Sequence, residues 1–372
     1  MGNLIRYHRS GYQWRRYDMS KKRERLIELD YIRTFAMLAV IVIHVSSAFV
    51  YSDSDYPLFG MNVAFILNQV TRFAVPLFVL LSGVALSISH ADGTYISFVK
   101  KRIVKLAGFY IAWNTVYYLL NSPEISLISF LKSMIYGNSA PHLYFIVIII
   151  QLYLLFPILN KWIKKAPLLT LAGSFFISAL LHFFISLPSL GNISILVKLY
   201  RIFPFWEAFP TWLFYFVLGM FAVQTGLEKI ISFAEKYLYL LFIVSIIFGA
   251  WYAHNSFLTD SLDSVKFQLF VYTPLVALTI LGMGRKLRGN KTLSAAVSFS
   301  ACHSQTVYFS HIIILENLRK IPAFSYRMRG MILLLISEIA LSIIFAWIFD
   351  WAIKQIFNFA HSKIAVDNSE EI

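Results

Sequence analysis

Residues 28–45 read ELDYIRTFAMLAVIVIHV and decide the fold class of this chain. A stretch of about 20 mostly apolar residues is long enough to cross the bilayer core as a helix. This stretch nevertheless contains Arg33 and His44. An ionisable side chain within a span costs about 2.5–3.5 kcal/mol on insertion scales. The stretch therefore predicts a transmembrane helix whose ionisable residues have a function.

The rest of the chain repeats this apolar pattern. Of its 372 residues, 58% are hydrophobic and 14% are charged, against about 45–50% and about 25% in soluble proteins. This composition argues against a water-soluble enzyme and predicts an all-α, polytopic membrane protein with about ten transmembrane helices. The ten apolar segments lie at 29–50, 63–89, 103–120, 143–160, 168–187, 211–226, 237–253, 267–283, 299–317 and 331–352.

Lys and Arg are distributed unevenly between the predicted loops. If the N-terminus is cytoplasmic, 23 of them lie on the cytoplasmic side and 8 on the outer side. Basic residues near the spans favour the cytoplasmic side, so we expect both termini to be cytoplasmic. The formal net charge of +14 then suits an anionic membrane surface rather than nucleic acid. The exception is loop 318–330, whose four basic residues indicate either a miscounted span or an anion-binding loop.

The predicted spans form one transmembrane domain over residues 29–352. A basic cytoplasmic segment at 1–28 precedes it, and a cytoplasmic tail at 353–372 follows it. The outer loop 188–210 contains aromatic residues that suit a membrane interface.

Three ionisable residues of the first two spans are candidates for chemistry. Arg33 and His44 are eleven residues apart, so at about 100° per residue they share one helix face, about 16 Å apart along the axis. Arg72 is near the middle of the second span, and Pro76 predicts a kink beside it. The Arg72 guanidinium either clamps an anion or carbonyl group, or pairs with a carboxylate or with carbonyls freed by the kink. The candidate acidic partners in or near the spans are Asp30, Glu207, Glu316 and Glu338.

Histidines occur at further positions of the predicted spans. His311 has a depth close to that of His44, and two imidazoles at one depth share a substrate, bind a metal or form hydrogen bonds with the backbone. His303 lies about 80° from His311 around the same helix. His142 opens the fourth span, at a lipid interface or a substrate contact. We expect no metal site, because no local histidine pair has i, i+4 spacing, carboxylates are scarce and Cys302 is the only cysteine.

Several segments resemble, in the same order, the signatures of the membrane-bound acyltransferase 3 family. The family marker is an Arg and a His separated by ten residues in the first span, as in Arg33 and His44. The segments that resemble the family are Leu29–Ala36, Arg72–Gly83, Lys101–Lys105, His142–Phe145, Phe214–Gly219 and Tyr308–His311. Two of them depart from the family pattern. Lys101 and Lys105 stand where the family often has Arg, and Tyr144 stands where it has Trp.

The resemblance covers about residues 28–350 and implies an integral membrane O-acyltransferase. Such an enzyme moves an acyl group, which we expect to be acetyl, from cytoplasmic acyl-CoA to a hydroxyl of a cell-envelope saccharide or lipid-linked sugar. Acyl-CoA is then the donor substrate, and we expect neither a bound cofactor nor a nucleic-acid partner. We expect the protein in the plasma membrane of a bacterium, as a multi-pass protein.

The residues permit a mechanism for this transfer. His44 acts as a general base on the acceptor hydroxyl, or carries the acyl group transiently. Arg33 helps to hold the donor phosphates or orders the first helix, and Arg72 stabilises the negative charge that develops on the carbonyl oxygen. We expect the donor to be bound by Lys101, Arg102 and Lys105. We expect substrate contacts from His142, His311 and Tyr308.

A polysaccharide or lipid-linked sugar exporter, or a flippase, is the alternative, because buried Arg and His residues also line conduction paths. An inverted repeat of spans broken by Gly or Pro would favour it, and the sequence contains none that is apparent. The cytoplasmic basic cluster beside the helix that carries His44 favours the enzyme.

Overall fold

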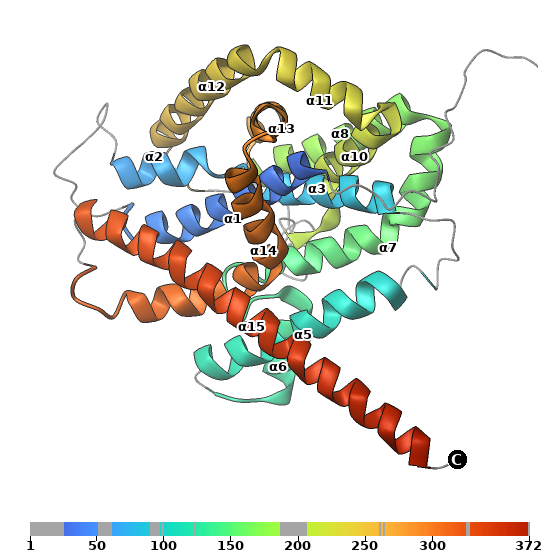
Figure 1. Cartoon of the computed structure of the whole chain (residues 1–372). Coiled ribbons are helices and arrows are strands. Elements are labelled where there is room, and N and C mark those ends of the chain that lie inside the picture. Colours follow the sequence, from blue (N-terminus) through green and yellow to red (C-terminus); the bar gives the residue numbers. More distant parts are fainter. Residues whose placement is uncertain are drawn as a thin grey trace, which may run out of the picture.

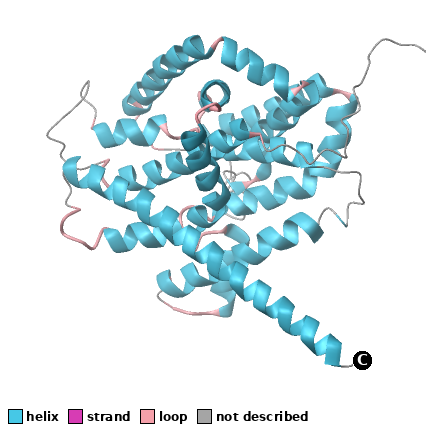
Figure 2. Cartoon of the chain, in the orientation of Figure 1, coloured by secondary structure: helices cyan, strands magenta, loops and turns pink. Residues whose placement is uncertain are grey.

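The computed structural model describes residues 26–50, 62–89, 97, 100–122, 124–186, 207–259, 262, 265–324 and 328–370. Every regular element in these ranges is a helix, and they contain no strand (Figure 2). The predicted all-α class is therefore confirmed for the described residues. Most of the predicted basic segment 1–28 and most of the predicted aromatic loop 188–210 lie outside the described residues.

Fourteen helical elements make up the described chain (Figure 1). They are α1 (Ile27–Ser47), α2 (Val63–Val70), α3 (Ala74–Ser89), the π-helix η1 (Lys100–Val104), α5 (Lys105–Asn121), α6 (Leu127–Tyr136), α7 (Tyr144–Lys165), α8 (Pro167–Ser186), α10 (Phe209–Thr225), α11 (Leu227–Lys236), α12 (Leu238–Leu258), α13 (Leu269–Leu287), α14 (Lys291–Leu318) and α15 (Met328–Glu370).

The described helices support a membrane protein, but not a firm count of spans. By length and composition, seven helical segments are long and apolar enough to cross a bilayer, and α10 with α11 forms an eighth candidate that bends by 96°. The helices α13 and α14 cover the eighth and ninth predicted spans but are not among these candidates. Ten crossings and the side on which each terminus lies stay predictions. No helix end marks the predicted boundary at residue 352, since α15 continues to Glu370.

Helix α1 lies at the centre of the helical assembly (Figure 1). It packs against α2, α3, α13, α14 and α15. At its N-terminal end the buried Glu28 carboxylate lies 2.7 Å from Nε of Arg285 on α13. Six residues further on, the Thr34 hydroxyl donates to the main-chain oxygen of Val297 on α14, at 3.1 Å. The helix that contains Arg33 and His44 is therefore held between protein neighbours rather than presented to lipid.

The second predicted span is one candidate span, Val63–Ser89, with a short interruption of the helix. The helix is interrupted at residues 71–73, between α2 and α3, where the sequence predicts a kink near Arg72. Pro76 follows at the third position of α3 and cannot donate a backbone hydrogen bond. The break places Arg72 in a turn rather than inside a continuous helix.

Helices α3 and α10 approach each other at two glycines. An ideal Cβ on Gly83 would lie 2.1 Å from the Phe216 main-chain oxygen, and one on Gly219 would lie 2.1 Å from the Leu80 main-chain oxygen. Small residues allow such close backbone approach between membrane helices. Any larger side chain at either position would force these two helices apart.

The close contact between α3 and α10 predicts that a methyl group added at Gly219 lowers the stability of the protein, whereas one added at an open glycine does not. We expect Gly219→Ala to destabilise the protein by about 1–3 kcal/mol, because overpacking displaces backbone. Gly173→Ala on α8 is the matched control, since a Cβ there meets no atom within 4 Å. Thermal unfolding of both variants in detergent micelles checks this prediction. Equal midpoints for the two variants would contradict it.

Candidate active site

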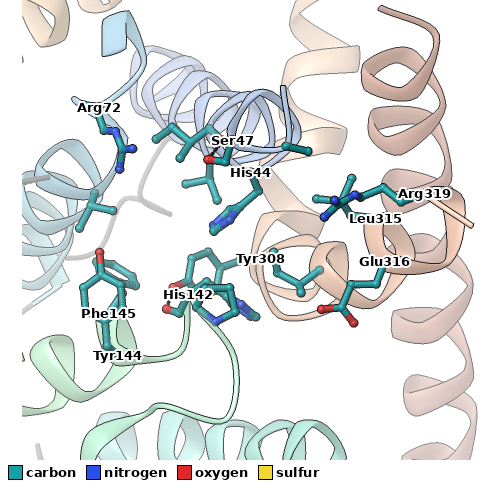
Figure 3. A pocket seen from close by; sticks show the side chains of 16 residues that line it. His44, Ser47, Arg72, His142, Tyr144, Phe145, Tyr308, Leu315, Glu316 and Arg319 are labelled. Carbon is teal, nitrogen blue, oxygen red and sulfur yellow. Dashed lines mark hydrogen bonds between the residues drawn. The ribbon is translucent and has the colours of Figure 1, made fainter. Parts of the chain in front are cut away.

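A cavity of about 670 Å³ opens where the ends of four helical segments meet (Figure 3). It lies between the C-terminal end of α1, the break before α3, the start of α7 and the C-terminal end of α14. Arg72 is on one side of it and Glu316 and Arg319 are on the other, with His44 and His142 between them. The lining residues are Val40, Ile43, His44, Ser47, Ala48, Arg72, Val75, Pro141, His142, Tyr144, Phe145, Tyr308, Ile312, Leu315, Glu316 and Arg319.

Three imidazoles from three predicted spans form a cluster at this cavity. The ring centroids of His44 and His311 are 5.1 Å apart, those of His142 and His311 are 4.9 Å apart, and those of His44 and His142 are 6.4 Å apart. Two unit charges 5 Å apart repel by about 3 kcal/mol at an effective dielectric constant of about 20. Two charged rings in this cluster would therefore be costly, and a neutral imidazole is available as a base.

His142 belongs to the turn before α7 and is held by its main chain. The Tyr308 hydroxyl donates a hydrogen bond to the His142 carbonyl oxygen. The ring is buried, and edge-on contacts at 5.2 Å join it to both Tyr308 and Tyr117. Neither ring nitrogen makes a hydrogen bond of normal geometry within the described part of the chain. The structure thus places His142 and Tyr308, two of the predicted substrate contacts, at the cavity wall.

The third predicted substrate contact, His311, lies behind the wall. Its side chain is 1% exposed and is not among the lining residues. It contacts the rings of both His44 and His142. The structure therefore brings His311 to the site but places the two other histidines between it and the cavity.

Arg72 is oriented by Asn68, an uncharged residue that a search for acidic partners in the sequence does not find. The side-chain oxygen of Asn68 accepts from Nη2 of Arg72 at 2.6 Å and from Nε at 3.1 Å. The Asn68 amide nitrogen donates to the end of α1, to the Ile43 carbonyl oxygen at 3.1 Å and to the hydroxyls of Ser46 and Ser47 at 3.2 and 2.9 Å. Asn68 thus fixes Arg72 relative to the helix end that carries His44.

The sequence contained a signal for Asn68. Asn68 and Gln69 are adjacent amides inside an apolar stretch, one turn before Arg72, and both are fully buried. Buried polar side chains in proteins have hydrogen-bond partners. Two amides at this place therefore indicate a polar network around Arg72.

Arg33 is not at the cavity. Its guanidinium lies 3.8 Å from the Asp30 carboxylate, three residues earlier on α1. The same carboxylate accepts from the Ser298 hydroxyl on α14, at 3.0 Å. The acidic neighbour of Arg33 is therefore Asp30, and the shared helix face predicted for Arg33 and His44 does not bring them to one cavity.

The predicted donor-binding residues Arg102 and Lys105 are not among the residues that line the cavity. Arg102 on η1 and Lys105 at the start of α5 are exposed, and the side chain of Lys101 lies outside the described residues. Tyr153 on α7 is within electrostatic range of both Arg33 and Arg102. Arg33 and Arg102 therefore have a common neighbour in Tyr153, and Arg33 belongs to the end of α1 opposite to His44.

His303 has a different environment from that of His311. Its Nδ1 lies 2.5 Å from the Asp350 carboxylate on α15, which also accepts from the Thr306 hydroxyl at 2.6 Å. The two histidines of α14 thus point in different directions, as their 80° separation predicts. Within the described ranges no three His, Cys, Asp or Glu side chains are arranged to hold a metal ion.

The Asn68 network predicts that replacing Asn68 by alanine destabilises the protein more than the same change at another buried asparagine. We expect Asn68→Ala to destabilise the protein by about 2–3 kcal/mol, because hydrogen bonds to a charged group and to the end of α1 are lost together. Asn114→Ala on α5 is the matched control, since this equally buried asparagine donates one hydrogen bond, to Ser133 at 3.0 Å. We expect it to cost about 1 kcal/mol. Unfolding midpoints in detergent measure both, and a larger loss for Asn114→Ala would contradict the prediction.

Comparisons with known proteins identify the family of this chain. The family model described as "Acyltransferase domain" matches residues 26–351. The chain is 23% identical to "Putative membrane-bound acyltransferase YfiQ" of Bacillus subtilis, over 80% of this chain and 84% of that protein. It is 24% identical to "Probable poly-beta-1,6-N-acetyl-D-glucosamine export protein" of Staphylococcus epidermidis, over 78% and 82% of the two chains. No solved structure matches. The chain belongs to the acyltransferase family that this model defines, as the resemblance in the sequence predicted.

Proposed function

We propose that this membrane protein transfers an acyl group, most simply acetyl, from acyl-CoA to a hydroxyl of a cell-envelope saccharide. The observation that supports this proposal is the cavity in which a guanidinium and two imidazoles, with a third behind them, face a common space. Acyl transfer requires a base for the attacking hydroxyl and a positive group for the carbonyl oxygen. The cavity contains both kinds of group.

His44 and Arg72 divide these tasks. The His44 imidazole removes the proton of the acceptor hydroxyl as its oxygen attacks the acyl carbonyl carbon, or His44 itself carries the acyl group between donor and acceptor. Arg72, held by Asn68, stabilises the negative charge on the carbonyl oxygen. When the carbon–sulfur bond of the thioester breaks, the proton held by His44 is available to the departing thiolate.

The donor is bound at the other end of α1. We infer that the N-terminus is cytoplasmic, so that Arg33, Arg102 and Lys105 are on the side from which acyl-CoA arrives. Arg102 and Lys105 are exposed and suit the phosphates of the coenzyme. Since about 16 Å of helix separates Arg33 from His44, the phosphates stay near the inner surface while the thioester reaches the cavity.

The acceptor is bound from the outer side. The lining combines hydroxyl and carboxylate groups, from Ser47, Tyr144 and Glu316, with the aromatic faces of Phe145 and Tyr308. Polar groups that form hydrogen bonds and aromatic rings that stack are the features that recognise sugars. A saccharide of the bacterial envelope, presented at the plasma membrane, is the acceptor class that we propose.

Export of a polysaccharide is the second candidate function, because a relative carries an export protein's name. Export requires a path through the whole membrane, whereas transfer requires only that donor and acceptor meet. The two functions are distinguished by whether labelled acyl groups become covalently attached to the acceptor.

The first experiment uses purified protein in liposomes with radiolabelled acetyl-CoA and an envelope saccharide fraction. We expect His44→Ala to reduce label incorporation by about 100-fold or more, because the base is lost. His182→Ala is the control, since His182 is buried on α8 and does not line the cavity. If folded His44→Ala protein transfers acetyl groups at the wild-type rate, or if wild-type protein moves saccharide across the membrane without labelling it, the proposal is wrong.

A second experiment tests the donor site. We expect Arg102→Ala together with Lys105→Ala to raise KM for acetyl-CoA about 10-fold with little change in kcat, since binding energy to the phosphates is lost equally in the ground and transition states. Lys161→Ala is the control, because Lys161 is an exposed residue of the α7 C-terminal half. An unchanged KM in the double variant would exclude these residues from donor binding.

A further inference from the structure

His311 offers a hydrogen-bond acceptor that nothing in the described structure uses. Its Nδ1 lies 2.7 Å from the Tyr308 main-chain oxygen and 3.2 Å from that of Val307. A carbonyl oxygen only accepts, so Nδ1 carries the hydrogen. In the neutral ring Nε2 then has the lone pair, and this buried atom has no hydrogen-bond partner among the described residues. A buried acceptor without a partner is costly, which indicates a partner that forms during function.

Among the described residues, three side chains face His311 and are the candidate donors of a hydrogen bond to its Nε2. They are His44, His142 and Tyr308, whose ring centroids lie 5.1, 4.9 and 6.0 Å from that of His311. The Tyr308 hydroxyl already donates to the His142 carbonyl oxygen. The ring of His142 lies within reach of the Phe309 carbonyl oxygen, which offers it another acceptor.

His44 has no such alternative. No hydrogen bond of its ring is found in the described structure, and its ring lines the cavity. A small rotation of the His44 side chain, of the kind that a bound substrate imposes, would aim a ring N–H at Nε2 of His311. This hydrogen bond fixes which nitrogen of His44 carries hydrogen, as an orienting group does for the histidine of a catalytic triad.

We propose that His311 is a positioning residue for His44. Its Nε2 accepts a hydrogen bond from one ring nitrogen of His44, so that the other nitrogen faces the cavity with its lone pair exposed. When that nitrogen takes the proton of the acceptor hydroxyl, the hydrogen bond to His311 remains and stabilises the charged ring. This role rests on the proposed function for its purpose, but its geometric part concerns His44 and His311 alone.

His182 shows what a histidine with only a structural role looks like in this protein. It is buried, and its Nδ1 lies 2.9 Å from the Ser178 main-chain oxygen, four residues earlier. Among the described residues its ring neighbours are Phe270 and Phe267, at 4.5 and 6.1 Å, and these include no second imidazole. His182 and His311 thus share the backbone hydrogen bond and differ in their neighbours, which makes His182→Phe a matched control for His311→Phe.

The experiment combines two measurements on wild type, His311→Phe, His311→Gln and His182→Phe. The first is the ¹⁵N NMR spectrum of histidine-labelled protein in detergent, in which the tautomer of His44 is assigned by comparison with His44→Ala. We expect one dominant His44 tautomer in wild type and His182→Phe, and a mixture in His311→Phe. The Gln variant, which retains an acceptor oxygen, should restore part of the preference.

The second measurement is acetyl transfer in liposomes as a function of pH. We expect His311→Phe to lower kcat by about 10- to 100-fold, the range known for loss of a hydrogen-bond partner of histidines at metal sites, with KM unchanged and a shifted pH profile. A His44 tautomer ratio that is the same in wild type and in both His311 variants would overturn the proposal. Since the NMR result needs no turnover, a protein without transfer activity but with the expected tautomer change would refute the proposed function and retain the role of His311.

Discussion

The hydrogen bonds of Asn68 join the end of α1 to Arg72, and the candidate site depends on them. A guanidinium that moved freely in the cavity would stabilise no particular charge. Here one amide oxygen receives two N–H groups of Arg72, while the amide nitrogen is bound to the Ile43 carbonyl and two serine hydroxyls of the helix that carries His44. Asn68 therefore links the cationic group to the helix that carries His44, before any substrate arrives.

This dependence explains why the break between α2 and α3 matters. A continuous helix through residues 71–73 would direct Arg72 according to helix periodicity alone. The turn frees its backbone from that constraint, and the cost of the break is reduced by hydrogen bonds such as that from Tyr272 to the Val70 carbonyl oxygen, at 2.9 Å. Extra polar contacts around the break extend to Lys266, whose ammonium group lies 3.3 Å from the Gln69 amide oxygen.

Much of the site was predictable because ionisable residues in apolar segments are rare. The cost of burial singled out His44, Arg72 and His311 from the sequence, and the structure brings all three together. The position of a residue along one helix does not, however, reveal its neighbours on other helices. Arg33 shares a face with His44, yet that face meets α14 at one end and the cavity at the other.

Other features needed tertiary structure to become visible. Asn68 is uncharged, so an argument from the cost of burying charges does not identify it. The adjacent amides indicate a polar network, but only the structure shows that Asn68 organises the site. The ten predicted spans each contain a helix, but α13 and α14 are not among the helices that length and hydropathy select as candidate spans. Tyr308 and His311 are two of the polar residues that lower the mean hydropathy of α14.

The charges at the N-terminal end of α1 bear on where an anionic donor is attracted. Arg33 lies beside the Asp30 carboxylate, and Arg285 lies 2.7 Å from the carboxylates of both Glu28 and Glu228. These residues largely neutralise one another, since each guanidinium faces a carboxylate. Positive potential on this side must therefore come from exposed residues such as Arg102 and Lys105, which face no carboxylate in any ion pair of the described chain. An arriving polyanion would be attracted there first, and Arg33 would act on it only at short range, from beside Asp30.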